Sequence, residues 1–229
     1  MINKVAILIP ARGGSKGIKN KNLKIFNKRP LLYWSIKQAL DSKFSSDIYV
    51  TSDSTNILNY AKKFNIKTIS RPKHLAKDSS STEDAILHFI KKSKIFYDII
   101  ILLQPTSPLR KKNDINNAYN LFMKKKCNSL FSVSSFSDFT VWKESNKKIV
   151  PFSYNPNSRL RRQRQTNYFI ENGSIYIFKS KLISKIMNRI DVKSFNIYKM
   201  NKLQFFEIDD LEDFKICENI FKSKIYLKL

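Results

Sequence analysis

A segment rich in glycine and basic residues has the composition of a phosphate-binding loop. It covers residues 10–23 (PARGGSKGIKNKNL) and holds three of the chain's four glycines together with Arg12, Lys16 and Lys21. Glycines let backbone N–H groups approach phosphate oxygens, and the three cations neutralise their charge. The spacing matches neither a Walker loop nor a dinucleotide-binding fingerprint. We predict a phosphate site here; the alternative is a basic turn that happens to contain glycines.

A second segment has polar side chains suited to binding a sugar. Residues 103–110 (LQPTSPLR) directly follow an apolar run, so they are expected at the carboxyl edge of a sheet, where ligands of α/β proteins gather. Its two prolines stiffen the backbone, as a binding shelf requires. The predicted contacts are Gln104, Thr106 and Ser107. The alternative is a plain proline-rich turn.

Two acidic residues near the C-terminus have the chemistry of a metal site. Glu207 and Asp209 are two positions apart, and the pattern of residues 204–208 predicts a strand that turns both side chains to one face. Carboxylates combined with nucleotide phosphates suit Mg²⁺. The alternative is that Asp209 or Asp210 caps a helix beginning near Leu211.

The elements that must position these residues alternate between strands and helices. Apolar, β-branched runs predict strands at 5–9, 48–51, 67–69, 98–103, 129–134, 174–178 and 204–208. Amphipathic segments predict helices at 31–40, 55–64, 82–94, 113–125, 179–190 and 210–220. This alternation predicts an α/β fold with one doubly wound, mostly parallel sheet. We expect a single domain over residues 1–229, with an irregular inserted arm at about 136–167.

Composition limits the classes of partner. Lys and Arg number 43 and Asp and Glu 18, so the formal net charge is +25, but the lysines are scattered along the chain. Scattered lysines are typical of solvated helix faces, and we expect no specific nucleic-acid partner. The two cysteines cannot form a disulfide framework or a four-cysteine metal site, and the apolar run at 99–103 is too short to cross a bilayer. We expect a cytoplasmic protein with no membrane partner.

Six ordered motifs resemble the acylneuraminate cytidylyltransferases, the family of CMP–sialic acid synthetases. They are residues 10–23, 50–53 (VTSD), 71–82 (RPKHLAKDSSST), 103–110, 171–176 (ENGSIY) and 208–213 (IDDLED). The resemblance covers nearly the whole chain. It implies a nucleotide-diphospho-sugar transferase-like fold and transfer of CMP from CTP to the anomeric hydroxyl of a nonulosonic acid, with release of pyrophosphate. It also implies a homodimer in which the arm reaches a neighbouring subunit.

The resemblance assigns roles residue by residue. The catalytic cations would be Lys21, Arg12 and Lys16, with Lys21 nearest the α-phosphate. Further CTP contacts would come from Ser15, Asn22, Arg71, Ser80 and Thr82. The sugar would meet Gln104, Thr106, Ser107, Tyr176 and Arg162, although the neighbouring Arg161 is an alternative for its carboxylate. Mg²⁺ would bind Asp209 and Glu207.

Alternatives remain open for the substrate. The enzymatic one is a cytidylyltransferase for the eight-carbon sugar KDO, and the other is a basic nucleic-acid-binding protein, suggested by the net charge and by residues 159–164 (RLRRQR). Ile170 stands where many family members carry arginine, so part of the sugar pocket is expected to be apolar. That would favour a deoxy, N-acylated sugar such as legionaminic acid over one rich in hydroxyls.

Overall fold

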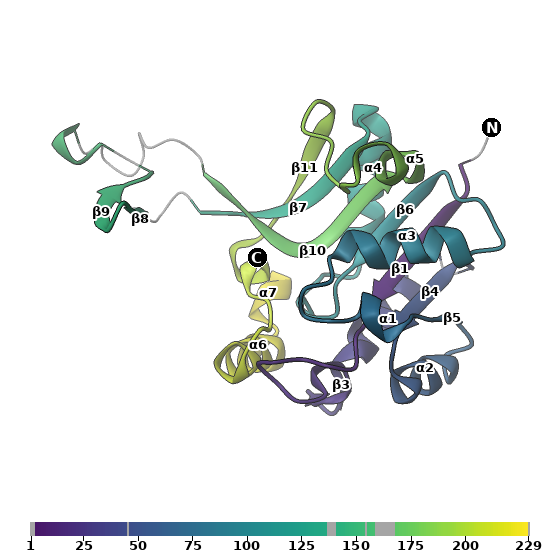
Figure 1. The fold of residues 1–229 in the computed structure, drawn as a ribbon. Helices are drawn as coiled ribbons and strands as arrows, with labels where there is room; N and C mark the ends of the chain where they lie inside the picture. Colours follow the sequence, from purple (N-terminus) through teal and green to yellow (C-terminus); the bar gives the residue numbers. More distant parts are fainter. Residues whose placement is uncertain (1–2, 45, 137–140, 154, 159–167, 229) are drawn as a thin grey trace.

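The core of the protein is a seven-stranded sheet with the order β11-β7-β10-β6-β1-β4-β5 (Figure 1). The computed structural model describes residues 3–44, 46–136, 141–153, 155–158 and 168–228. The strands are β1 Val5–Pro10, β4 Ile48–Ser52, β5 Lys67–Ser70, β6 Ile99–Leu103, β7 Ser129–Ser135, β10 Phe169–Lys179 and β11 Phe195–Met200. β10 alone runs antiparallel to its two neighbours, so the sheet is mixed but mostly parallel, as predicted.

Helices cover both faces of the sheet because its central strands are apolar on both sides. In β1, Ile7 and Ile9 join one buried cluster while Ala6 and Leu8 join another. α1 Leu31–Leu40, α2 Thr55–Lys62 and α4 Asp114–Lys125 pack on the first face. α3 Thr82–Lys92 and α5 Ser180–Ile186 pack on the second.

The C-terminal segment returns to the N-terminal part of the chain. α6 Leu211–Ser223 and α7 Ile225–Lys228 pack with the short pair β2 Ile25–Phe26 and β3 Arg29–Pro30 in a third apolar cluster. Phe26 lies at its centre, in edge-to-face contact with Phe214 and Phe221. This packing brings the segment before α6 close to the loop after β1.

Two elements differ from the sequence prediction. Residues 204–208 do not form a strand: a short 3-10 helix, Lys202–Phe205, is followed by irregular chain. Asn201 caps this turn, and the buried Gln204 side chain donates hydrogen bonds to the Leu109 carbonyl and to Asp114. The last strand is instead β11, which was not predicted.

The inserted segment contains a hairpin. β8 Trp142–Ser145 pairs antiparallel with β9 Lys148–Pro151, and a 3-10 turn, Pro156–Ser158, follows. The hairpin stands away from the body of the protein (Figure 1). It exposes apolar side chains, with Ile149 65% and Phe152 64% exposed.

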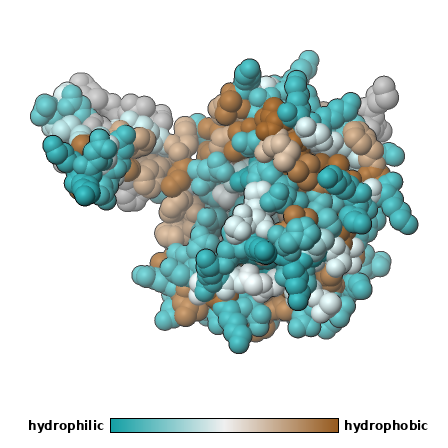
Figure 2. Space-filling model, viewed as in Figure 1, coloured by the Kyte–Doolittle hydropathy of each residue, from teal (hydrophilic) through white to brown (hydrophobic). Residues whose placement is uncertain are grey.

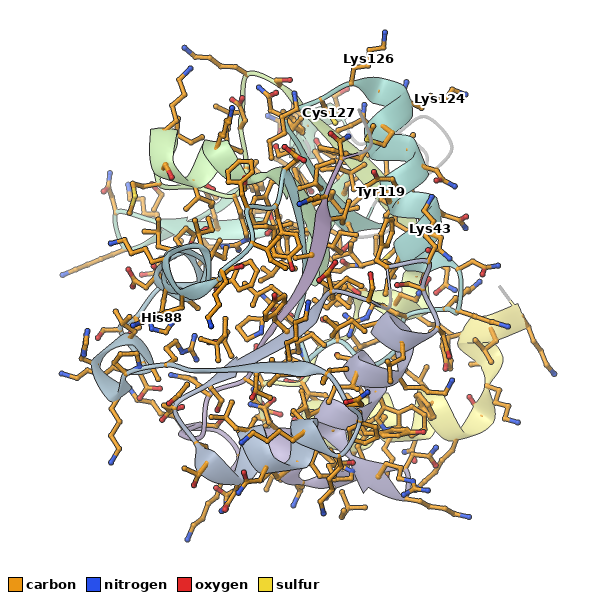
Figure 3. All side chains as sticks on the ribbon, turned by 90° about the vertical axis from the view of Figure 1, so that its right-hand side faces the viewer. Lys43, His88, Tyr119, Lys124, Lys126 and Cys127 are labelled. Atoms are coloured by element: carbon orange, nitrogen blue, oxygen red, sulfur yellow. The ribbon has the colours of Figure 1, made fainter. Side chains whose placement is uncertain are left out.

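The surface is largely hydrophilic on the face shown in Figure 2, with small apolar patches between polar side chains. Lysines contribute through scattered positions: Lys124 and Lys126 extend outward from the end of α4, and Lys43 lies 4.8 Å from the centre of the Tyr119 ring (Figure 3). Within the described residues, no helix combines the length and the apolar character that crossing a membrane requires.

Candidate active site

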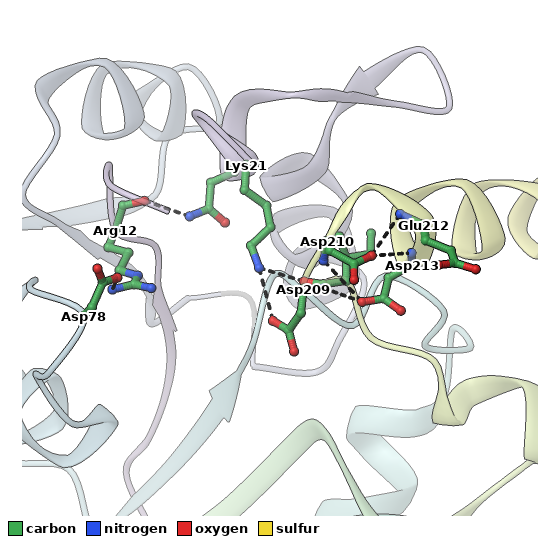
Figure 4. Close-up of polar contacts among 9 residues, drawn as sticks. Arg12, Lys21, Asp78, Asp209, Asp210, Glu212 and Asp213 are labelled. Atoms are coloured by element: carbon green, nitrogen blue, oxygen red, sulfur yellow. Dashed lines mark hydrogen bonds and ion pairs between the residues drawn. The ribbon is translucent and has the colours of Figure 1, made fainter. Parts of the chain in front are cut away.

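Lys21 is held where the loop after β1 meets the segment before α6. It begins the 3-10 turn Lys21–Leu23 after β1, and its Nζ donates to the Ile208 carbonyl at 2.7 Å and pairs with Asp209 Oδ1 at 3.3 Å (Figure 4). The side chain is only 12% exposed. Its neighbour Asn22 is buried and donates to the Arg12 carbonyl at 2.9 Å, which fixes the loop. A cation is thus fixed beside the acidic segment.

Two of the glycines in this loop are required by close packing against other parts of the protein. A Cβ at Gly17 would lie 2.3 Å from the Asp209 carbonyl oxygen, and one at Gly13 would lie 2.8 Å from Ser54 Cβ. Gly13 also donates its N–H to Asp53 Oδ1 at 2.8 Å. Gly14 has open space around it. Close approach of the Asp209 backbone at Gly17 and of the Ser54 side chain at Gly13 therefore accounts for two of the glycines that the sequence assigned to phosphate binding.

Arg12 and Lys16 share an acidic partner from the opposite side of the cleft. Asp78, in the loop between β5 and α3, pairs with Arg12 Nη1 at 2.6 Å and with Lys16 Nζ at 3.4 Å. Lys16 is 81% exposed, whereas Arg12 is 35% exposed. Sequence inspection did not single out Asp78.

A cleft of about 300 Å³ joins most of the predicted residues. Its walls come from the loop after β1, the loop before α3, the turn after β6 and the segment before α6. The predicted residues in its lining are Arg12, Ser15, Lys21, Asn22, Arg71, Ser80, Thr82, Gln104, Thr106, Glu207 and Asp209. Lys16, Ser107 and Tyr176 are described in the structure but are not part of this lining. Arg161 and Arg162 lie outside the described residues.

The loop before α3 is stabilised by hydrogen bonds among its own residues. The Ser80 hydroxyl donates to the His74 carbonyl at 3.0 Å and accepts the Lys77 N–H at 3.1 Å, so it shapes the loop. Ser81 caps α3 in a reciprocal capping box with Asp84. Ser81 therefore supplies the helix cap in this segment, and the binding roles of Ser80 and Thr82 stay predictions.

Arg71 opens the same loop and is buried. It is 6% exposed, its Nε has no hydrogen-bond partner among the described residues, and burial lowers its pKa. His88, on α3 (Figure 3), is also buried with both ring nitrogens unpartnered within the described part of the chain, and burial lowers its pKa as well. A buried guanidinium with an unused donor in the cleft wall is suited to a polar ligand.

Arg110 is a buried residue that anchors the turn after β6, a role that was not identified from the sequence. It is 3% exposed, and its guanidinium donates to the carbonyls of Gln104 and Ser174 at 3.2 and 2.9 Å. Further bonds reach Gln38 Oε1 at 2.7 Å and the Ser35 hydroxyl. Arg110 thus joins the shelf, α1 and β10.

Two predicted sugar contacts face the interior in this structure. Ser107 is 2% exposed and donates to the Asn172 carbonyl at 3.4 Å. Tyr176 is 3% exposed and donates to Glu171, while the Arg189 guanidinium lies 4.3 Å from the centre of its ring. Both side chains are buried against other parts of the protein, and direct contact with a sugar stays a prediction.

Arg189 completes a charged cluster beneath Tyr176. Its Nη1 pairs with Glu83 at 2.6 Å, and its Nη2 lies 4.0 Å from Glu171. Glu83 stands on the first turn of α3, so the cluster ties α3 to β10. No sequence motif pointed to this arginine.

The acidic pair lies in the cleft although its predicted strand is absent. Gly173, at φ +62°, separates Glu207 from Gln104: a Cβ there would lie 2.4 Å from Glu207 Oε2 and 3.1 Å from Gln104 Oε1. Burial, and then the charge of Asp209, raises the pKa of Glu207 to about 7. A largely buried carboxylate and an exposed one in the same cleft suit a cation between them.

The helix-capping alternative is settled by Asp210. Its side chain accepts the N–H groups of Glu212 and Asp213, each at 2.9 Å, and Asp213 reciprocates in a capping box (Figure 4). Asp209 is therefore not needed as the cap. Its carboxylate is 74% exposed and faces Lys21.

A second hollow of about 300 Å³ adjoins the cleft. It shares Glu207 and Asp209 with the cleft and has an apolar wall. The remaining lining residues are Ile170, Glu171, Phe205, Phe206 and Asp213. Ile170 thus contributes to the apolar wall of this hollow, and its place in a sugar pocket stays a prediction.

Comparison with known proteins identifies relatives of this chain. Residues 6–228 match the family model described as cytidylyltransferase. The chain is 34% identical over 218 residues to N-acylneuraminate cytidylyltransferase A of Danio rerio, which covers 93% of the chain and 50% of that relative. It is 27% identical over 222 residues to pseudaminic acid cytidylyltransferase of Campylobacter jejuni, which covers 94% and 95%. The chain thus spans about half the length of the Danio rerio protein.

Among solved structures, CMP:2-keto-3-deoxy-manno-octonic acid synthetase complexed with CTP aligns with a TM-score of 0.72. The alignment covers 97% of this chain and 100% of that one at 16% identity, so it establishes the shared fold. The family match extends over nearly every element that lines the cleft. The chain belongs to the cytidylyltransferase family.

Proposed function

We propose that the protein transfers CMP from CTP to the anomeric hydroxyl of a nonulosonic acid and releases pyrophosphate. The observation that carries this proposal is the single cleft in which Lys21, the Gln104 shelf and the two acids meet. The names of the relatives, which act on N-acylneuraminic and pseudaminic acids, support the sugar class. Transfer at phosphorus requires alignment and charge neutralisation, and the cleft offers both.

The nucleotide would occupy the wall formed by the first two loops. Arg71 and the following loop, with Ser80 and Thr82, would bind cytosine, while Arg12, Ser15, Lys16 and Asn22 would hold the phosphates. Lys21 would stabilise the charge that develops at the α-phosphate, because its Nζ is already fixed by Ile208 and Asp209. The position needs no rearrangement of a long, flexible side chain.

The residues present fit Mg²⁺. Glu207 and Asp209 line one cleft, where burial and then the charge of Asp209 raise the pKa of Glu207, and a divalent cation would stabilise both carboxylates in their charged form. The described residues contain no group of three or more His, Cys, Asp or Glu side chains arranged for a metal, so substrate phosphates would supply other ligands. Bound Mg²⁺ would neutralise phosphate charge.

The sugar would occupy the adjoining hollow. Its apolar wall of Ile170, Phe205 and Phe206 suits a deoxy or N-acyl group, because such a wall cannot satisfy buried hydroxyls. Its acids, Glu171 and Asp213 among them, would repel the substrate carboxylate. A compensating cation is therefore required, and Arg162 or Arg161 remains our candidate.

The quaternary state and location are also proposals. The hairpin extends from the body and exposes Ile149 and Phe152, which favours a homodimer in which the arm contacts a second subunit. We propose one cytidylyltransferase domain with this inserted arm, and a cytoplasmic location stays a prediction.

Pyrophosphate release tests the function. With N-acetylneuraminic, legionaminic, pseudaminic acid and KDO as acceptors, we expect turnover with CTP and little with ATP, GTP or UTP. We expect legionaminic or N-acetylneuraminic acid to give the highest kcat/KM. No release with any acceptor would contradict the proposed function, whereas a clear preference for KDO or pseudaminic acid would contradict only the sugar branch.

Asp209→Asn tests the metal site. We expect the variant to need at least about tenfold more Mg²⁺ for half-maximal rate, with a lower kcat, because a charged ligand is lost. Mg²⁺ titrations of the rate measure this. Asp210→Asn is the matched control: it removes the neighbouring charge and keeps an N-cap residue, so its curve should follow the unmodified protein. Superimposable curves for Asp209→Asn would exclude this metal assignment.

A further inference from the structure

The carboxylate of Asp78 forms ion pairs with Arg12 and Lys16, the two cations that the proposed function assigns to phosphate binding. Asp78 lies 2.6 Å from Arg12 Nη1 and 3.4 Å from Lys16 Nζ, and its own carboxylate is 41% exposed (Figure 4 shows the Arg12 pair). Asp78 and Arg12 both line the cleft. An anionic ligand bound by the same two cations must displace this carboxylate or share them with it.

The loop holds Asp78 in place without using its side chain. Lys77 and Ser80 are joined by a backbone hydrogen bond of 3.1 Å, and the Ser80 hydroxyl bridges Lys77 and His74. Within the described residues, the Asp78 carboxylate pairs only with Arg12 and Lys16. The carboxylate can therefore leave the cations without breaking the loop.

The two groups of cations in the cleft have different partners. Lys21, assigned to the α-phosphate, is held by Ile208 and Asp209, whereas Arg12 and Lys16 are held by Asp78. Asp78 is therefore placed at the cations that would hold the phosphates beyond the α-phosphate, and it does not pair with Lys21. These two phosphates depart together as pyrophosphate.

We propose that Asp78 is an internal competitor of pyrophosphate, which weakens binding of the β- and γ-phosphates and returns to Arg12 and Lys16 when the product leaves. The proposal rests on the proposed function, because it takes the phosphate positions from it. Asp78 would thereby weaken the binding of CTP and of pyrophosphate and leave the binding of CMP unaffected, because CMP has no β- or γ-phosphate to compete with the carboxylate. When pyrophosphate leaves, the Asp78 carboxylate replaces it, so Arg12 and Lys16 keep an anionic partner throughout.

Calorimetric titration of Asp78→Asn tests this inference. With Mg²⁺ and ionic strength fixed, we expect the variant to bind CTP and pyrophosphate about three- to tenfold more tightly than the unmodified protein, the scale of losing partly exposed ion pairs. We expect its Kd for CMP to change by less than about twofold. The inhibition constant of pyrophosphate in the forward reaction should fall by the same factor as its Kd.

Glu212→Gln controls for general charge. Glu212 is an exposed acid on the first turn of α6, three residues after Asp209, and its removal subtracts the same charge near the cleft. Equal tightening by both variants, tightening of CMP as much as pyrophosphate, or no tightening by Asp78→Asn would overturn the role of Asp78. Failure of the unmodified protein to bind CTP at all would instead contradict the proposed function, and the inference with it.

Discussion

Replacing Lys21 with alanine is expected to lower kcat by about 10²–10³-fold, the scale of losing one fixed electrostatic donor at a transition state. The Lys21 ammonium is 12% exposed and lies against the Ile208 carbonyl and Asp209, so its position is set before substrate binds. Initial rates at saturating CTP and sugar measure the effect. Thermal unfolding of the same variant separates lost chemistry from lost fold.

Lys19→Ala is the matched control for this variant. Lys19 lies in the same loop but is exposed and does not line the cleft, so its removal should leave kcat within about twofold, as for a solvated surface charge. Near-full turnover by Lys21→Ala would show that the assigned role is wrong and would make Lys16 the candidate.

Replacing Arg110 with methionine is expected to lower the free energy of unfolding by about 2–4 kcal/mol, because several buried acceptors lose their donor at once. These include the Gln104 and Ser174 carbonyls and Gln38 Oε1. Relief of the burial that lowers the pKa of Arg110 offsets part of the loss. Denaturant titration measures the stability change.

The functional readout of Arg110→Met is the KM for the sugar. Because Arg110 holds the Gln104 backbone, we expect this KM to rise more than the KM for CTP in protein that is still folded. Arg29→Met is the control: Arg29 is exposed and lies over Tyr33 at 5.5 Å, so its loss should cost less than about 1 kcal/mol. Equal stability losses in the two variants would contradict the anchoring role.

The helices and the main-sheet strands of the first two-thirds of the chain were predictable because their patterns are local, whereas the short pairs β2–β3 and β8–β9 were not predicted. β6 reads as an unbroken apolar run, and α1 begins directly after Pro30, so composition alone sets their bounds to within a residue or so. The prediction of a strand at 204–208 was wrong because tertiary contacts determine the conformation there. The buried Gln204 side chain donates to the Leu109 carbonyl and to Asp114, which lie about ninety residues earlier. β11 was missed because it is a partly exposed edge strand whose apolar and polar residues alternate weakly.

The parts of the site that could not be predicted are pairings across the fold. Sequence located the cationic loop and the acidic segment, but it could not place Lys21 against Asp209, which is 188 residues away. Nor could it pair Asp78 with Arg12 or show that Arg110 supports Gln104. A side chain that acts through another element leaves no local pattern, whereas a glycine-rich loop does.

The dependence of Lys21 on Ile208 and Asp209 has a consequence for biosynthesis. These partners are made 187 and 188 residues after the lysine, and at about 5–20 residues per second their synthesis follows it by roughly 10–40 s. Throughout that interval the nascent chain displays the basic loop without the acidic segment that fixes its lysine. The arrangement that we propose around Lys21 therefore cannot be completed before residue 209 has been made, and we expect a chain that stops short of this residue to lack the fixed lysine.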